Sequence, residues 1–509
     1  MKPFKTVNIA IAAGALAFTV LVGAAALDQT HAQTSGTGPP GSVGGPSNGP
    51  GGTSSHGGGH SGKNWISPAE LRRQYKIWRS KQRKCRGNDC RVVKRTPPPK
   101  IAVNNIPKPP KRVFISKLPT PKPNDGASNG MPPAGEDRFR PDELVVVFGP
   151  GVSPNAIAAF QAAQGLTTIR SHRINLVGAQ VHQFRIANGQ NVPDAIRALQ
   201  ELQQVAFVQP NYLYSLQDQQ TAGSSGAAIS QYAIERLNLQ PAHALAKGAR
   251  VRIAVIDSAV DYNHTELNGT IANRFDAVSS ADLSAHSHGT AIAGVIAAHA
   301  RLLGVAPSAT ILSIRAFAPD PNGGIAQGTT YDVIRGLDWA ISNRARIVNM
   351  SFAGPRDPML AQALKEARSR GVILIAAAGN AGADSPPLYP AADESVLAVT
   401  ATDNQDGLFK AANRGNYISI AAPGVDILTL APDNGYQILS GTSLAAAHVS
   451  GLAALLLERN PKLDPEGVAN ILVLASADLG KPGHDKEFGA GLPDAMAAVS
   501  NVKAKLASQ

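Results

Sequence analysis

Residues 440–457 join a turn of small residues to a long apolar segment, and they set the strongest limit on the fold. Between residues 444 and 457 the only titratable side chain is His448, and all others are Ala, Val, Leu, Gly or Ser. A helix of this composition must be buried on all sides, so the fold needs layers that enclose it. Ser443 lies at the first turn, where unpaired N–H groups and the helix dipole favour negative charge on an oxygen atom. The alternative is a capped core helix, because serine is a common N-cap residue.

Three further polar residues stand at the ends of apolar segments. Asp257 ends a β-branched run that is typical of a buried parallel strand, and Asn380 follows a second such run. His288 opens a helix of small residues. Because the carboxyl ends of parallel strands line one crevice, we expect these side chains to meet there. With Ser443 they make four chemistry-capable residues, each at the terminus of an element, that fit one mechanism.

These segments resemble those of the subtilisin-like serine proteases, which carry Asp, His and Ser in this chain order. The matching motifs are Asp257-Ser258, His288-Gly289-Thr290 and Gly441-Thr442-Ser443, and the resemblance extends over residues 229–503. It implies that Asp257, His288 and Ser443 form a catalytic triad and that Asn380 belongs to the oxyanion hole. His286 is then a flanking residue.

A fourth segment resembles the one that lines the primary specificity pocket in proteins of this family. It consists of Ser351, Phe352, Ala353 and Gly354 and follows another apolar run. Pairing of a substrate backbone with this segment, as a strand added to a sheet, predicts cleavage within extended chains. The predicted function is therefore that of a serine endopeptidase acting on polypeptides.

Apolar strands and helices alternate through this region, which predicts an α/β fold with a doubly wound, mostly parallel sheet. Helices are expected near residues 289, 329, 358 and 443. Strands are expected at 251–257, 310–317, 346–352, 372–378, 395–401 and 418–422. Residues 504–509 are a short tail.

Residues 138–217 predict a separate, ferredoxin-like α+β unit of the order β-α-β-β-α-β. Its first helix starts after Ser153 and is expected to bury Ile157, Phe160 and Ala163. A unit directly before a subtilisin-like domain is similar to the family's inhibitory propeptide, so the chain's own propeptide is a predicted partner. Its last strand is expected to continue into the active site, with cleavage between about residues 215 and 230, around a linker at 218–228. An independent binding module is the alternative.

Residues 1–32 resemble a signal peptide, because Lys2 and Lys5 precede an uncharged apolar run that ends before small residues. This predicts a secreted or periplasmic protein. The run is nearly long enough to span a bilayer, so an uncleaved anchor is the alternative. Residues 33–62 are rich in Gly, Ser and Pro and predict a flexible linker.

Residues 63–137 form a basic, Pro-rich extension. Positions 63–122 hold 18 Lys and Arg and 2 acidic residues, so the chain's net charge of +12 is concentrated there. Interleaved aromatic residues fit contact with an anionic surface or polymer, while a solvated spacer is the alternative. No specific nucleic-acid binding is predicted. Cys85 and Cys90 are the only cysteines and are close enough in sequence for a small-loop disulfide in an oxidising compartment.

No cofactor is required by these motifs. Calcium remains an alternative from the resemblance, although the loop that would hold it, at residues 298–301, is short and lacks Asn-rich oxygen ligands. Two rival functions stay open. One is a catalytically silent or surface-anchored binding protein that uses the basic segment. The other is an acyl hydrolase, which the absence of a Gly-x-Ser-x-Gly elbow at Ser443 disfavours.

Overall fold

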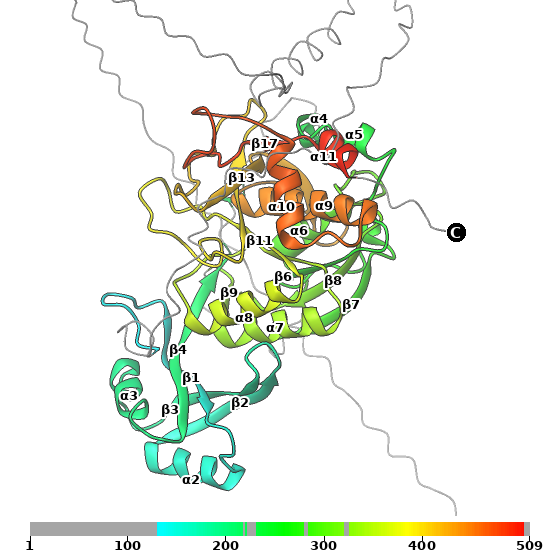
Figure 1. Ribbon diagram of the computed structural model, residues 1–509. Coiled ribbons are helices and arrows are strands. Elements are labelled where there is room, and N and C mark those ends of the chain that lie inside the picture. The colour runs from blue at the N-terminus through cyan, green and yellow to red at the C-terminus, as the bar shows by residue number, and fades with distance from the viewer. Residues whose placement is uncertain (1–129, 217–218, 221–230, 279–283, 320–324, 503–509) are drawn as a thin grey trace, which may run out of the picture. The chain divides into compact units, whose positions relative to one another are not determined.

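A computed structural model describes residues 130–216, 219–220, 231–278, 284–319 and 325–502 (Figure 1). The expected signal peptide at 1–32, the linker at 33–62, the basic segment at 63–122, both cysteines and the tail at 504–509 lie outside the described residues. Within the described ranges, none of the helices combines the length and the apolar character that crossing a bilayer requires.

The amino-terminal part of the described chain is a four-stranded antiparallel sheet with two helices. The sheet order is β2-β3-β1-β4, which is that of a ferredoxin-like unit and confirms the prediction. Ser153 caps the first helix, and Gly165 ends it in a left-handed conformation. The expectation for Ala163 was wrong, because only Phe160 of this helix is fully buried and Ala163 is exposed. The elements are β1 (Phe139–Phe148), α2 (Pro154–Gln164), β2 (Leu166–Ile174), β3 (Ala179–Ile186), α3 (Val192–Leu199) and β4 (Val205–Ser215).

The two faces of this antiparallel sheet are both apolar. Leu144 and Val146 on β1 pack with residues of α2 and α3. Val145 and Val147, one position away on the same strand, belong to a cluster that includes residues of the carboxyl-terminal region, which begins at residue 231. Since side chains of a strand alternate between faces, the sheet is covered by its own helices on one side and by the carboxyl-terminal region on the other.

Seven parallel strands form the central sheet of the carboxyl-terminal region, in the order β13-β12-β11-β10-β6-β8-β7. Six were expected from their apolar runs. The seventh, β7, was not predicted, because it is an edge strand whose residues are half-buried or exposed and form no apolar run. The strands are β6 (Arg252–Asp257), β7 (Ile271–Asp276), β8 (Thr310–Arg315), β10 (Ile347–Met350), β11 (Ile373–Ala377), β12 (Leu397–Thr402) and β13 (Ile418–Pro423).

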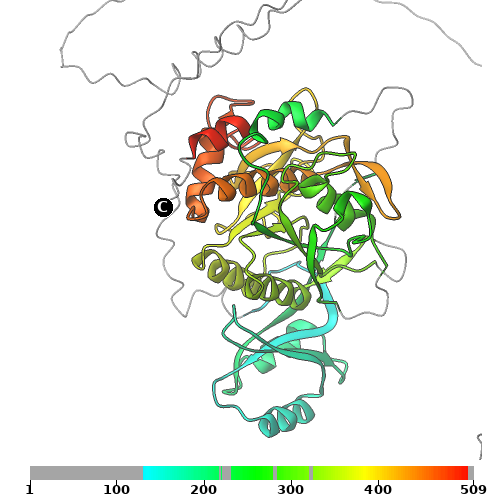
Figure 2. The ribbon, with the colours of Figure 1, turned by 90° about the vertical axis from the view of Figure 1, so that its right-hand side faces the viewer.

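Helices cover both faces of this parallel sheet (Figures 1 and 2). On one face lie α6 (Ser287–Ala297), α9 (Thr442–Arg459), α10 (Pro465–Leu474) and α11 (Ala495–Asn501), and on the other lie α7 (Thr330–Ser342) and α8 (Pro358–Ser369). Helix α9 is buried without interruption from Thr442 to Leu457, as its composition predicted. The doubly wound α/β fold is thereby confirmed.

Short elements complete the description. The hairpin β14–β15 packs beside α6 and pairs with β5, and the small strand β9 extends the antiparallel sheet at β4. The remaining elements are α4 (Tyr232–Arg236), α5 (Leu239–Ala242), η2 (Thr265–Leu267), β5 (Gln219–Gln220), β9 (Gln327–Thr329), β14 (Ile427–Ala431), β15 (Gly435–Ser440), β16 (Ser476–Ala477) and β17 (Leu492–Pro493).

Candidate active site

Asp257 and His288 are in direct contact at the carboxyl edge of the parallel sheet. Asp257 is the last residue of β6, and His288 lies in the first turn of α6. Nδ1 of His288 is 2.7 Å from Oδ1 of Asp257, and both residues are buried. The same carboxylate oxygen accepts hydrogen bonds from the backbone N–H and the hydroxyl of Ser258. These bonds hold the carboxylate in one orientation toward the imidazole.

His286 has a different role from His288. Its Nδ1 accepts the backbone N–H of His288 at 3.3 Å and lies 3.0 Å from the Ser258 hydroxyl, so it caps helix α6. Burial lowers the pKa of His286, which keeps the ring neutral and able to accept. Helix α6 approaches β6 very closely, because a Cβ at Gly289 would lie 2.4 Å from the Ser258 carbonyl oxygen. The glycine after His288 is therefore required for this contact.

Ser443 reaches the same edge of the sheet from α9. Its hydroxyl donates to the carbonyl oxygen of Ser351 at 3.3 Å, and the Ser351 hydroxyl donates to the Ser443 carbonyl oxygen at 3.2 Å. Ser351 directly follows β10, whose neighbour in the sheet is β6. Ser351 and Asp257 thus follow adjacent strands, so Ser443 and the Asp257–His288 pair belong to one edge.

Asn380 lies three residues beyond β11 and contacts the turn that precedes α9. Its Oδ1 accepts the backbone N–H of Thr442 at 3.0 Å and the Thr442 hydroxyl at 2.7 Å. With Oδ1 used in this way, Nδ2 is the donor end of the amide. Thr442 had no role in the sequence interpretation, although it is part of the Gly-Thr-Ser motif, and it fixes the orientation of Asn380.

The segment from Ser351 to Gly354 forms one side of a strand-binding groove. The end of β4 lies in it, where Ser215 donates its N–H to the Ala353 carbonyl at 2.9 Å and accepts the Ala353 N–H at 3.1 Å. On the other side, Leu213, Tyr214 and Ser215 pair with β9, and Leu216 donates to the Ala326 carbonyl at 3.2 Å. Sequence reasoning missed β9, since three residues are too few to show any periodicity.

A short strand continues this arrangement beyond the groove. In β5, Gln219 and Gln220 pair antiparallel with Ser440 and Leu439, which end β15. Ser440 is three residues before Ser443. The described backbone on both sides of residues 217–218 is therefore held against segments that carry the candidate site.

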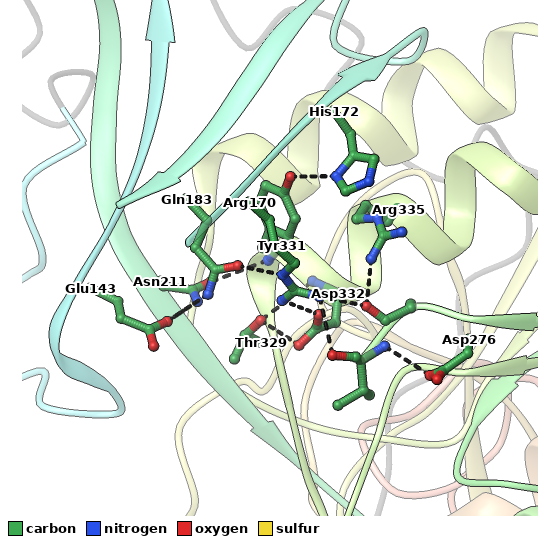
Figure 3. Close-up of polar contacts among 12 residues, drawn as sticks. Glu143, Arg170, His172, Gln183, Asn211, Asp276, Thr329, Tyr331, Asp332 and Arg335 are labelled. Atoms are coloured by element: carbon green, nitrogen blue, oxygen red, sulfur yellow. Dashed lines mark hydrogen bonds and ion pairs between the residues drawn. The ribbon is translucent and has the colours of Figure 1, made fainter. Parts of the chain in front are cut away.

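A buried polar network links the antiparallel sheet to α7 (Figure 3). Arg170 on β2 donates to Asp332 on α7 at 2.7 Å, and Asn211 on β4 accepts the backbone N–H of Tyr331 at 3.2 Å. Asn211 also donates to the buried carboxylate of Glu143 at 2.7 Å. Burial raises the pKa of Asp332, although the guanidinium of Arg170 opposes this shift. The amino-terminal unit is thus bound by matched polar groups as well as by apolar packing.

The loop after α6 does not fit a calcium ion. Calcium requires oxygen ligands, but the backbone N–H groups of Ala300, Arg301 and Leu302 all donate to the carboxylate of Glu266 at 2.7–3.1 Å. The hydroxyl of Tyr436 donates to the same carboxylate at 2.9 Å. Although burial opposes it, these donors hold the pKa of Glu266 below its usual value. Within the described ranges, no three His, Cys, Asp or Glu side chains are grouped as metal ligands.

The substitution Glu266→Gln is expected to destabilise the fold by about 1–3 kcal/mol, because an amide NH₂ group in place of Oε2 would face the Ala300 N–H, and the donors to Oε1 would lose their charged acceptor. Denaturant unfolding in millimolar calcium and in a chelator measures this effect. We expect the loss to be the same in both solutions. Restoration of the variant by calcium would contradict this interpretation of the loop.

Serine, histidine, aspartate and asparagine side chains lie together at the carboxyl edge of the parallel sheet. This arrangement is suited to hydrolysis in which a serine hydroxyl is the nucleophile. Two family profiles match the chain: the Subtilase family over residues 248–491 and the Fervidolysin N-terminal prodomain over residues 126–211. The thermophilic serine proteinase of Bacillus sp. strain AK1 is 34% identical over 282 residues, which cover 54% of this chain and 68% of that protein. Subtilisin DY of Bacillus licheniformis is 34% identical over 259 residues, covering 50% and 92% respectively.

Among solved structures, the chain is similar to fervidolysin from Fervidobacterium pennivorans, described as a keratinolytic enzyme related to subtilisin. The TM-score is 0.63 with 26% sequence identity, and the match covers 73% of this chain and 62% of fervidolysin. The chain belongs to the subtilase family of serine peptidases, and the unit before its catalytic region is similar to a subtilase prodomain.

Proposed function

We propose that the chain is an exported serine endopeptidase, made as a precursor that its own prodomain inhibits. In this proposal Ser443 Oγ attacks the substrate carbonyl carbon while His288 Nε2 takes the hydroxyl proton. His288 then gives this proton to the leaving amine, and water hydrolyses the acyl-enzyme in a second round of the same transfers. Asp257 fixes the imidazole and stabilises its charged form. The 2.7 Å contact between the buried Asp257 and His288 side chains carries this assignment.

Asn380 and the backbone N–H of Ser443 are proposed to stabilise the oxyanion. The backbone N–H and the hydroxyl of Thr442 both donate to Oδ1 of Asn380, so the Nδ2 end of the amide is the one that can donate to an oxyanion. We expect Asn380→Ala to lower kcat by about 100- to 1000-fold with little change in KM, the size of effect found when subtilisin loses the corresponding donor. Steady-state rates on a fluorogenic peptide measure this.

A matched control for this substitution is Asn343→Ala, at the carboxyl end of α7 and therefore at the opposite edge of the sheet. Its rates are expected to equal those of the wild type. Because Asn380 assists the reaction without taking part in bond formation, Asn380→Ala should keep detectable activity where Ser443→Ala does not. Equal activity of these two variants would contradict the assigned roles.

Endopeptidase activity is proposed from the strand-binding groove. A substrate in the register of Ser215 and Ala353 pairs with backbone on both sides, which requires an extended chain and does not require a free terminus. In that antiparallel register, the substrate residue two positions after the one opposite Ala353 lies opposite Ser351. Ser443 Oγ is 3.3 Å from the Ser351 carbonyl oxygen. The carbonyl group that Ser443 attacks is therefore that of the substrate residue opposite Ser351.

Self-inhibition is proposed because the end of the prodomain occupies this same groove. Applied to the chain's own sequence, the register predicts cleavage of the Gln217–Asp218 bond, inside the range expected from the sequence. The polar network of Figure 3 would keep the prodomain bound after the cut. Export to the periplasm or the medium, and contact of residues 63–122 with an anionic surface, remain part of the proposal from the sequence alone.

A sulfonyl fluoride that reacts with activated serines tests the nucleophile directly. The wild-type protein is incubated with the reagent, and hydrolysis of an unfolded protein and peptide mapping by mass spectrometry are compared. We expect one modified serine, Ser443, and loss of hydrolysis in proportion to its modification. Modification elsewhere, or hydrolysis that persists after complete reaction at Ser443, would overturn the proposal.

A further inference from the structure

The side chain of Tyr214 fills a pocket of the catalytic region. It is fully buried, and its ring meets that of Phe352 edge-on with centroids 5.6 Å apart. Gly354 forms another wall, where a Cβ would lie 2.4 Å from Cδ1 of Tyr214. The glycine therefore makes room for an aromatic ring. The Phe317 ring packs at a tilt against that of Phe352, with centroids 4.8 Å apart, so the Phe352 wall of the pocket is itself held by aromatic packing.

The end of this pocket is polar. The Tyr214 hydroxyl donates to Oδ2 of Asp357 at 3.1 Å, and Asp357 is only 3% exposed. Thr330 donates to the same oxygen at 2.6 Å, and the N–H of Met359 donates to Oδ1 at 2.9 Å, because Asp357 is the N-cap of α8. Gln209 of the prodomain adds a bond to Oδ1 at 2.9 Å. The catalytic region thus fixes the carboxylate by itself, and it remains in place when the prodomain has left.

The position of this pocket relative to the bond that is cut follows from the backbone register. Tyr214 precedes Ser215, which lies opposite Ala353. A substrate in the same register has its scissile carbonyl two residues after the one opposite Ala353. A residue in the Tyr214 pocket is therefore the fourth residue on the amino side of the scissile bond.

We propose that Asp357 makes this pocket selective for tyrosine at the fourth residue before the scissile bond. This inference rests on the proposed peptidase function. A phenylalanine ring fits the same walls, but it leaves a buried carboxylate oxygen without the hydrogen bond that the phenol supplies. Sites that bond a substrate hydroxyl in this way discriminate against the analogue that lacks it.

A matched pair of internally quenched peptides tests the proposal. Both carry the sequence of residues 210–222, one with Tyr and one with Phe at position 214, and the self-processed wild-type enzyme is the catalyst. We expect kcat/KM to be at least about tenfold higher for the Tyr peptide, the effect of one hydrogen bond to a charged acceptor. The readout is the ratio within each enzyme, so a change in overall activity cancels.

Two variants complete the test. Asp357→Ser keeps a residue that caps helices but is too short to reach the phenol, so the Tyr-to-Phe ratio should fall to within about threefold. Asp464→Ser makes the same change at the N-cap of α10, where Asp464 accepts the Gly467 N–H at 2.7 Å, and should keep the wild-type ratio. Equal cleavage of both peptides by the wild type, or a wild-type ratio in Asp357→Ser, overturns the selectivity alone. Cleavage of neither peptide by the wild type overturns the proposed function and this inference with it.

Discussion

Ser443→Ala is expected to lower peptide hydrolysis by about a million-fold, the size of effect measured when subtilisin loses its serine. Without the hydroxyl no acyl-enzyme forms, and only the oxyanion donors and substrate binding still accelerate attack by water. The variant should fold normally, because its hydroxyl makes a single 3.3 Å hydrogen bond to Ser351 and α9 is fixed by its apolar packing. Initial rates on an unfolded protein, together with thermal unfolding, measure both effects.

Ser476→Ala is the matched control for this substitution. The Ser476 hydroxyl donates to the Leu472 carbonyl on α10 at 2.9 Å, and Ser476 pairs with Pro493 in the short β16–β17 ladder. Its removal should leave the hydrolysis rate unchanged within about twofold, as is usual for a substitution away from the reacting groups. Residual activity of Ser443→Ala above a few per cent would mean that another group is the nucleophile.

The second large effect is expected for Asp257→Asn, which should lower kcat by about 10⁴-fold with KM nearly unchanged. The carboxylate accepts from Nδ1 of His288 at 2.7 Å, which leaves Nε2 unprotonated and able to take the serine proton. Because Oδ1 of Asp257 accepts from Ser258 and from Nδ1 alike, an asparagine that keeps an oxygen at this position lacks the negative charge that stabilises the imidazolium. In the other orientation of the amide, its NH₂ group faces Nδ1. The imidazole then carries its proton on Nε2, which is the wrong tautomer for a general base.

Asp261→Asn is the comparison for this charge loss. Asp261 lies a few residues after Asp257 and accepts the backbone N–H groups of Asn263 and Asp433. Its rate should stay within a few-fold of the wild type. Comparable losses in Asp257→Asn and Asp261→Asn would indicate a general charge effect and would contradict the orienting role of Asp257.

The central part of the fold was predictable because its sequence signals are strong and local. Strands β6 and β11 are uninterrupted apolar runs, and α9 has a composition that only complete burial can accommodate. Asp257 ends β6, Asn380 follows β11 and Ser443 lies in the first turn of α9, so the topology of a parallel sheet brings these residues to one edge.

Other parts depend on contacts that no local pattern reveals. Strand β9 owes its conformation to β4, more than 100 positions earlier in the sequence, and Asp357 looks like an ordinary N-cap before a proline. Nothing near Asp357 indicates that the hydroxyl of Tyr214 reaches it. Ala163 was expected to be buried from helical periodicity, but most residues of α2 are exposed and only Phe160 is fully buried.

Self-processing tests the account most directly, through the intact masses of the wild-type protein and of Ser443→Ala, both expressed without residues 1–32. We predict that the wild type separates into two pieces at the Gln217–Asp218 bond, while Ser443→Ala stays at full length. If both proteins remain at full length, or both are trimmed alike, Ser443 is not a working peptidase nucleophile. A binding protein built on a peptidase fold would then explain the chain better than an enzyme.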